Sequence, residues 1–121
     1  MTLPLVLLLL ACNREAPATQ QPAAPPPNAA AEEGRQLAAR YGCGTCHVIP
    51  GVEGAQGALG PSLAGVASRP AISFGTVENT PANLAQFIQD PASRNPQSSM
   101  PPMAITDAEA GAIAAFLGTL K

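Results

Sequence analysis

Three stretches of the chain place apolar residues at the three- and four-residue intervals typical of an amphipathic helix. The clearest is the last, in which Ile113, Phe116, Leu117 and Leu120 recur at these intervals. The first two stretches carry shorter stripes of the same kind. This pattern predicts helices over residues 32–41, 81–90 and 107–120.

Residues that favour helix ends border the second and third stretches. Thr80 can cap the second helix, with Pro81 at its first position and Pro91 as its stop. Thr106 and Glu109 have the spacing of a capping box at the start of the third. These signals locate the helix ends independently of the apolar pattern.

The segment between the first and second helices contains more than thirty residues without a regular pattern. A short helix over residues 62–67 is the one element predicted there, and the alternation typical of strands is absent throughout. The sequence therefore predicts an all-α fold with three main helices. So long an irregular segment is unusual in a compact domain, unless it wraps a large apolar group.

The chain begins with an apolar run over residues 3–11. A membrane-spanning helix needs about 20 residues, so residues 1–11 are interpreted as a secretory signal peptide. The junction Leu9-Leu10-Ala11-Cys12 resembles a bacterial lipobox, which implies that Cys12 is lipidated and becomes the new N-terminus. The alternative is an ordinary cleavable signal followed by an incidental cysteine.

Residues 13–31 contain five Pro and seven Ala but no Val, Ile, Leu, Met or aromatic residue. Such a segment has nothing to bury, which predicts a disordered spacer. We therefore divide the chain into the signal peptide, a lipidated cysteine with its linker over residues 12–31, and one folded domain over residues 32–121.

Composition limits what this domain can be. About 90 residues with four aromatic side chains and no Trp make a marginal core, and an apolar prosthetic group would relieve that shortage. Over the whole chain, acidic residues outnumber Lys and Arg by 8 to 6, which argues against a basic nucleic-acid-binding module.

The motif that carries chemistry is Cys43-Gly44-Thr45-Cys46-His47. Cys-x-x-Cys alone could be a redox disulfide, half of a zinc site or a haem anchor. A zinc site needs four ligands, and His47 is the one histidine of the chain. A thioredoxin-like disulfide would need a βαβ pattern around it, which is absent. Cys-x-x-Cys-His after a helix fits covalent attachment of c-type haem, and an export signal agrees with this interpretation.

Further short motifs follow in a fixed order. They are Gly34 nine residues before Cys43, Gly60-Pro61-Ser62-Leu63, Arg69 eight residues after Pro61, Asn79-Thr80-Pro81, Ser98-Ser99-Met100-Pro101-Pro102, and Thr106-Asp107. With these motifs, residues 32–121 resemble the small class I c-type cytochromes. They are especially similar to the bacterial domains found free or fused to the second subunit of haem–copper oxidases. The tryptophan common in that family is missing, and Phe74 and Phe87 are the candidates to fill its space.

The resemblance implies a haem site. His47 would be the proximal iron ligand, with its second ring nitrogen on the backbone carbonyl of Pro61. A methionine must be the sixth ligand, since no other soft or imidazole ligand is left in the mature chain. Met100 matches the family position and precedes a proline, whereas Met103 is interpreted as a packing residue.

The resemblance also assigns supporting residues. Arg69, Ser98 and Asn79 are expected to bond the haem propionates. Gly34 and Gly111 lack side chains where helices would approach closely, and the family packs its first and last helices together.

A six-coordinate, protein-ligated iron has no open position for a substrate, so we interpret the protein as a one-electron carrier rather than an enzyme. The partners implied are redox proteins of an electron-transport chain: a quinol–cytochrome c reductase, a terminal oxidase or a dehydrogenase. The predicted location is periplasmic or extracytoplasmic, with a membrane anchor at Cys12. Two alternatives stay open: a haem-based sensor or weak peroxidase in which the methionine dissociates, and a structural lipoprotein with a Cys43–Cys46 disulfide.

Overall fold

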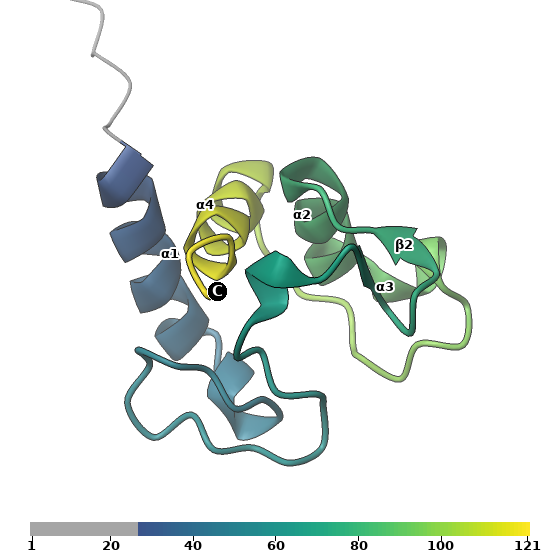
Figure 1. The fold of residues 1–121 in the computed structure, drawn as a ribbon, viewed down its shortest axis with the longest axis horizontal. Helices are drawn as coiled ribbons and strands as arrows, with labels where there is room; N and C mark the ends of the chain where they lie inside the picture. Colours follow the sequence, from purple (N-terminus) through teal and green to yellow (C-terminus); the bar gives the residue numbers. More distant parts are fainter. Residues whose placement is uncertain (1–26) are drawn as a thin grey trace, which may run out of the picture.

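The computed structural model describes residues 27–121, whose regular structure is mostly helical (Figure 1). In chain order the elements are α1 (Pro27–Arg40), the 3-10 turns η1 (Cys43–Thr45) and η2 (Val66–Ser68), β1 (Ala71–Ile72), β2 (Val77–Glu78), α2 (Pro81–Gln89), α3 (Pro91–Arg94) and α4 (Asp107–Leu117). The predicted all-α class with three main helices is confirmed, since the strands form one two-stranded antiparallel hairpin of two residues each.

Helix α1 begins at Pro27, five residues before the predicted start at residue 32. The predicted linker therefore ends too late, because its last five residues are helical. Proline is tolerated in the first turn of a helix, where its missing N–H would have no partner. Three consecutive alanines at 29–31 then extend the helix through intrinsic propensity, without an apolar stripe.

Helices α1 and α4 cross closely and form the largest interface between elements. In Figure 1 they lie side by side. A Cβ at Gly34 would overlap the carbonyl oxygen of Ala112 and lie 2.9 Å from Cβ of Phe116, which confirms the close approach predicted at Gly34. The same prediction was wrong for Gly111, because that glycine is exposed and a Cβ there would meet nothing within 4 Å.

The N-terminal ends of α2, α3 and α4 are capped by side chains. The Thr80 hydroxyl accepts a hydrogen bond from the Asn83 N–H, and both halves of the predicted Thr106–Glu109 capping box are present. Pro91 ends α2 as predicted, but it also starts α3, for which Asp90 is the N-cap. Asp90 is therefore the single residue that separates α2 from α3.

The segment between η1 and α2 departs from the sequence prediction in two ways. The predicted helix over residues 62–67 is a single 3-10 turn, η2, which overlaps only its end. The β1–β2 hairpin was not predicted, because two-residue strands are too short to show alternation. Its turn holds Ser73 and Phe74 at φ values of 52° and 57°.

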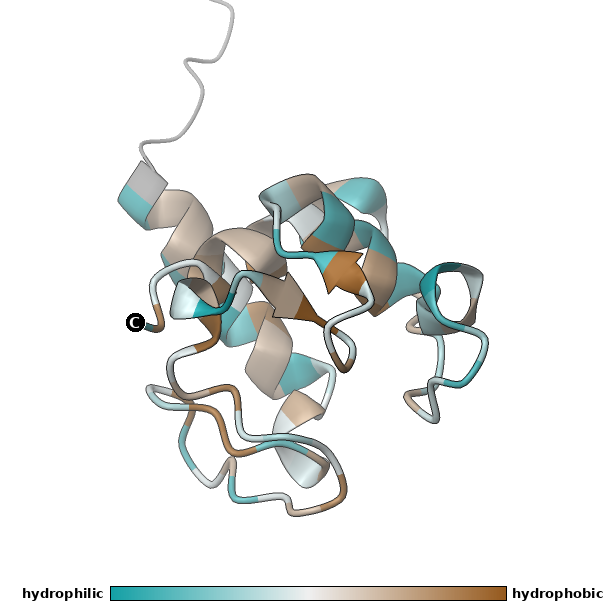
Figure 2. Ribbon diagram, turned by 45° about the vertical axis from the view of Figure 1, so that its right-hand side comes forward, coloured by the Kyte–Doolittle hydropathy of each residue, from teal (hydrophilic) through white to brown (hydrophobic). Residues whose placement is uncertain are grey.

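The core is centred on α4, which packs against both α1 and α2, and it also includes residues of the hairpin and of the loop after η1. Both strands of the hairpin appear brown in Figure 2, whereas the segment after α3 is mostly pale or teal. The fully or nearly buried apolar side chains include Leu37, Ile49, Val66, Ile72, Val77, Leu84, Ile88, Ile113, Phe116 and Leu117. Within residues 27–121, no helix has both the length and the apolar character that crossing a membrane requires.

Candidate functional site

The Cys-x-x-Cys-His motif lies on a tight turn directly after α1. Gly42 adopts a left-handed conformation with φ 69°, which ends the helix and starts η1. The backbone N–H groups of Cys46 and His47 both donate to the carbonyl of Cys43, at 3.3 and 3.0 Å. This turn brings the two thiols and the imidazole into one short, internally bonded segment.

The two cysteines are half-buried, separate thiols. Burial raises the pKa of the Cys43 thiol, and the neighbouring Cys46 adds to the rise. A thiol of raised pKa is protonated at neutral pH and attacks disulfides poorly. The site is therefore unlike that of a thiol–disulfide oxidoreductase.

The His47 ring is held by the loop that returns to it. Its Nδ1 lies 2.7 Å from the carbonyl oxygen of Pro61. Two backbone bonds dock this loop: the Gly60 N–H donates to the Cys46 carbonyl at 2.7 Å, and the Leu63 N–H donates to the Val48 carbonyl at 2.8 Å. A carbonyl can only accept, so Nδ1 carries the proton and Nε2 is left with the lone pair that a metal would need.

Gly60 makes this arrangement possible. A Cβ on Gly60 would lie 2.7 Å from Nδ1 and 3.0 Å from Nε2 of His47. Any larger residue would therefore push the ring off the Pro61 carbonyl. The Gly-Pro pair thus supplies both the space for the imidazole and the acceptor that orients it.

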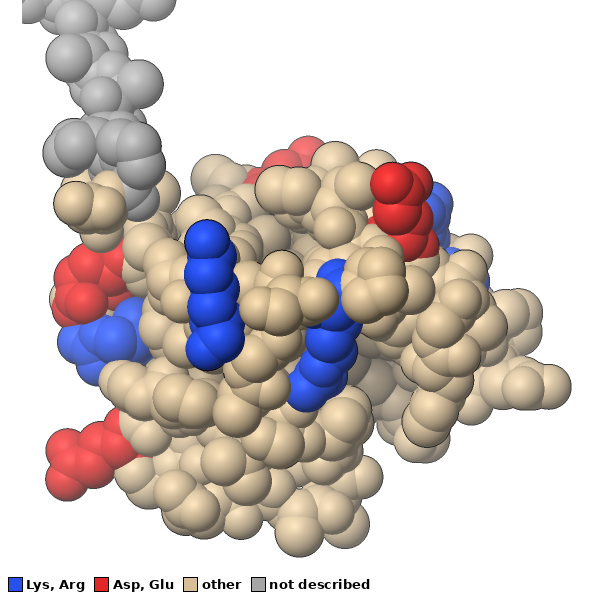
Figure 3. All heavy atoms as spheres, in the orientation of Figure 1, with Lys and Arg blue, Asp and Glu red and all other residues tan. Residues whose placement is uncertain are grey.

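The donor set fits a haem better than a metal ion alone. Among the described residues, no group of three or more His, Cys, Asp or Glu side chains could hold a metal ion. Two thiols with one oriented imidazole are instead the groups that c-type haem attachment uses. In Figure 3 the surface is hollowed between the loops of residues 43–63 and the loop that follows α3.

The two methionines of this second loop have different surroundings. Met103 packs against the core, and its N–H donates to the Gln89 carbonyl at 3.2 Å. Met100 is half-buried and is not among the side chains packed on the core of the described region. The structure therefore agrees with the interpretation of Met103 as a packing residue and leaves Met100 available as a ligand.

Arg69 and Ser98 keep hydrogen-bond donors for a carboxylate. Nη2 of Arg69 donates to the carbonyls of Ser62 and Ala64, at 2.7 and 3.1 Å. A guanidinium has five N–H groups, so its Nε and Nη1 groups stay available. The Ser98 oxygen accepts from the Met100 N–H at 3.3 Å, and its own hydroxyl hydrogen is unused by that bond.

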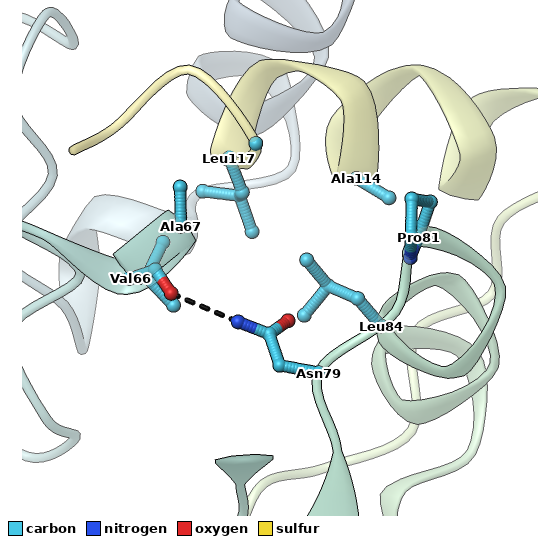
Figure 4. A pocket seen from close by; sticks show the side chains of 8 residues that line it. Val66, Ala67, Asn79, Pro81, Leu84, Ala114 and Leu117 are labelled. Carbon is cyan, nitrogen blue, oxygen red and sulfur yellow. Dashed lines mark hydrogen bonds between the residues drawn. The ribbon is translucent and has the colours of Figure 1, made fainter. Parts of the chain in front are cut away.

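Asn79 does not fit the role that the resemblance suggested. Its Nδ2 donates to the carbonyls of Val66 and Arg69, at 2.9 and 2.8 Å. An amide nitrogen has two N–H groups, so none is left for a propionate. Figure 4 shows Asn79 reaching Val66 beside a small cavity of about 160 Å³ between η2, α2 and α4. Its observed function is to tie the segment around η2 to the start of α2.

The two aromatic candidates for the space of the missing tryptophan differ in their burial. Phe87 packs against the core, whereas Phe74 is 94% exposed at the tip of the hairpin. Of the two candidates, Phe87 is therefore the one that fills space inside the described protein. Among residues 27–121, Leu59 is the other large apolar side chain exposed to water, at 86%, and it precedes the Gly60 that contacts His47.

Several residues around the site could not be found from motifs. The Tyr41 hydroxyl donates to Glu109 at 2.8 Å and so joins the end of α1 to the start of α4. Asn95 is the one buried polar side chain among the described residues, and it contacts the hairpin. Neither Asn95 nor Gln89, which contacts residues 105 and 107, belongs to a sequence signature.

Comparison with known proteins adds three findings. Residues 31–121 match the family model described as Cytochrome c. A curated relative, cytochrome c-552 of Bradyrhizobium diazoefficiens, is 37% identical over 91 residues, which cover 75% of each chain. The crystal structure of the c-type cytochrome SorU from Sinorhizobium meliloti matches with a TM-score of 0.54 and 22% identity, covering 77% of this chain and 92% of that one. This structural likeness shows the fold.

Proposed function

The chain belongs to the cytochrome c family, and on that premise we propose that it is a membrane-tethered electron carrier whose iron is held by His47 and Met100. Membership itself establishes that the protein binds haem c covalently and transfers electrons between redox partners. The ligands, the tether and the partners belong to the proposal.

The observation that carries the proposal is the bond between the His47 ring and Pro61, next to two unjoined thiols. When bound, haem supplies an iron that gains and loses one electron. The protein's part is to present Cys43 and Cys46 for attachment and to keep Nε2 of His47 unprotonated and aimed by the Pro61 carbonyl. Arg69 and Ser98 would donate to the propionates with the N–H and O–H groups that the structure leaves unused.

Met100 would be the sixth ligand, from the loop on the far side of the hollow. Histidine–methionine ligation raises the reduction potential relative to two nitrogen ligands. If His47 and Met100 both bind the iron, no coordination site would be open for a substrate. A sensor or peroxidase would need Met100 to leave, and the sequence has no second histidine to act as an acid or base there.

The proposed partners are extracytoplasmic redox proteins of a respiratory chain. Residues 32–121 carry seven acidic residues against five basic ones. Figure 3 shows the charged side chains scattered over this face without a patch of one sign. Docking would then use mainly apolar surface around the site, with weak electrostatic steering and little salt dependence. Lipid at Cys12 would hold the domain near its partners; Cys12 and the signal peptide lie outside the described residues.

Covalent haem attachment is tested with protein produced in a host able to attach c-type haem. The intact mass should include one haem in addition to the polypeptide and any group on Cys12, and acid–acetone should not extract the pigment. The double variant Cys43→Ser with Cys46→Ser is the control, and its mass should lack the haem. A colourless wild-type protein with a Cys43–Cys46 disulfide would contradict the proposal.

A further inference from the structure

We infer that two amide side chains, Asn95 and Gln89, are positioning residues that fix the two ends of the loop carrying Met100. The inference rests on the proposed ligation by Met100. The loop comprises residues 96–104, between the end of α3 and the residues that lead into α4. Its stiffness determines how readily the sulfur can leave the iron.

Asn95 fixes the first end. Its side chain is only 8% exposed. Its Nδ2 donates to Oγ of Ser73 in the hairpin at 2.9 Å, and its Oδ1 accepts from the Gln97 N–H at 3.0 Å. The Asn95 carbonyl also accepts from the Ser98 N–H at 2.9 Å. One buried residue therefore joins the loop to an element more than twenty residues earlier in the chain.

The same series of bonds continues to Met100. The Met100 N–H donates to Oγ of Ser98 at 3.3 Å, and Ser98 is itself bonded to Asn95. Pro101 and Pro102 follow directly, and their rings restrict the backbone further. The backbone that presents Met100 is thus connected to the hairpin through consecutive hydrogen bonds.

Gln89, the last residue of α2, fixes the other end. Its carbonyl accepts from the Met103 N–H at 3.2 Å. Its Nε2 donates to the Ile105 carbonyl at 3.2 Å and to Oδ1 of Asp107 at 2.9 Å. Met103 also packs on the core, so this end is held by both polar and apolar contacts.

Movement of Met100 away from the iron requires the loop to shift between these two ends. Breaking the bonds of Asn95 or Gln89 removes a restraint on that movement without touching the sulfur. A buried hydrogen bond contributes about 1 kcal/mol net, which corresponds to roughly a fivefold change in an equilibrium constant. The two amides should therefore affect dissociation of Met100 more strongly than they affect any other property of the site.

The test uses the haem-loaded protein with imidazole as the exogenous ligand. Ferric wild type, Asn95→Ala, Gln89→Ala and Ser73→Gly are titrated with imidazole, while the near-infrared band of sulfur-ligated ferric haem is followed. Ser73→Gly removes only the acceptor for Asn95, at a φ of 52° that favours glycine, so added strain cannot explain its effect. We expect imidazole affinity to rise about fivefold for Ser73→Gly, which loses one side-chain bond, and by roughly ten- to thirtyfold for Asn95→Ala and Gln89→Ala, which each lose two.

Two truncations of similar size serve as controls. Gln86→Ala removes an exposed amide one turn before Gln89 that makes no side-chain hydrogen bond within residues 27–121. Asn83→Ala removes an amide bonded to Glu78 and Arg94, neither of which lies in the segment from Asn95 to Asp107 that the two amides contact. Both should bind imidazole as wild type does. The free energy of unfolding, measured on every variant, separates general destabilisation from loop release.

The outcomes distinguish this inference from the proposal beneath it. If wild type lacks the near-infrared band, or if Met100→Ala retains it, ligation by Met100 is wrong and the inference falls with it. If that ligation holds but Asn95→Ala and Gln89→Ala bind imidazole no more tightly than Asn83→Ala, the positioning function alone is overturned. Higher imidazole affinity that merely follows the loss of unfolding free energy across all variants, controls included, would also overturn it.

Discussion

In this protein, hydrogen bonds to nearby backbone groups determine which donors of a polar side chain are left unused. Asn79 donates both of its amide N–H groups to the carbonyls of Val66 and Arg69. These bonds join the segment around η2 to the start of α2. Arg69 uses one nitrogen for bonds to two carbonyls, and those bonds leave its Nε and Nη1 groups unused. The residue type alone does not distinguish these outcomes, because both side chains are donors of suitable length.

The two methionines offer a direct test at this scale. Met100→Ala should abolish the near-infrared band of the ferric protein and open the iron to added ligands. Met103→Ala should keep the band and lose only packing, at most the roughly 2–5 kcal/mol of a buried methionine truncation. The spectrum and the free energy of unfolding are measured for both variants. The opposite pattern would move the ligand to Met103.

Glu109 should make stability dependent on acid pH. Its carboxylate accepts from the Thr106 N–H and the Tyr41 hydroxyl, and these bonds lower its pKa below the ordinary value of 4.5, with the Thr106 bond contributing most. A pKa depressed by folding contributes stability above the unfolded value, and this stability is lost as the pH falls through the folded pKa. Unfolding free energy should therefore drop below about pH 4.5.

The variant Glu109→Gln tests this expectation. It should be less stable than wild type at pH 7 and should lose less stability between pH 5 and about pH 2. Glu53→Gln, at an exposed carboxylate without a side-chain hydrogen bond among the described residues, is the matched control. Equal acid slopes in wild type and Glu109→Gln, measured by denaturant titration at each pH, would contradict the assignment.

At the scale of elements, the crossing of α1 and α4 organises the rest. Gly34 allows the two backbones to approach, and the Tyr41–Glu109 bond joins the helices near the other end of their contact. Because η1 follows α1 within three residues, this crossing also fixes where the Cys-x-x-Cys-His turn begins. The site is thus positioned by helices that contribute none of its ligands.

Substitution by alanine should lower the stability of the protein at Gly34 and raise it at Gly111. Gly34→Ala places a methyl group against the Ala112 carbonyl and Phe116, which should cost about 1–3 kcal/mol or more through overpacking. Gly111→Ala meets nothing within 4 Å and should stabilise α4 by up to about 1 kcal/mol, since alanine is the better helix former. Thermal or denaturant unfolding measures both. A stable Gly34→Ala protein would show that the helices do not cross closely there.

At the scale of the whole molecule, a small core supports a long loop. The segment between η1 and α2 contains little regular structure, yet it returns to the Cys-x-x-Cys-His turn through backbone hydrogen bonds from residues 57, 60 and 63. Haem c gives such a segment a large apolar surface to cover. This explains how more than thirty mostly irregular residues belong to a compact domain.

The tether is the prediction that belongs to the whole chain. If Cys12 carries lipid, wild-type protein should be found in the membrane fraction and need detergent for extraction, and its mass should include acyl chains. Cys12→Ser should release a red, folded domain into the soluble fraction, because residues 27–121 form a hydrophobic core of their own. Wild-type protein that is soluble without detergent and carries no acyl mass would overturn the tether.

The sequence alone determined much of this protein. It predicted the three main helices, the caps at Thr80 and Thr106, and a haem-binding motif at residues 43–47, because capping, helical periodicity and covalent attachment depend on residues close together in the chain. It located the start of α1 five residues too late, since helix propensity in an alanine run leaves no apolar pattern. It also missed the hairpin, and it could not separate Phe87, which packs on the core, from the exposed Phe74.

Only the tertiary structure decided which partner each of several side chains contacts. The use of both Asn79 N–H groups, the anchoring of the Met100 loop by Asn95 and Gln89, and the different surroundings of Gly34 and Gly111 all depend on partners distant in sequence. A hydrogen bond or a close backbone approach is set by two positions at once. A single position in the chain carries no sign of the partner that it will meet, and for that reason these assignments required the folded molecule.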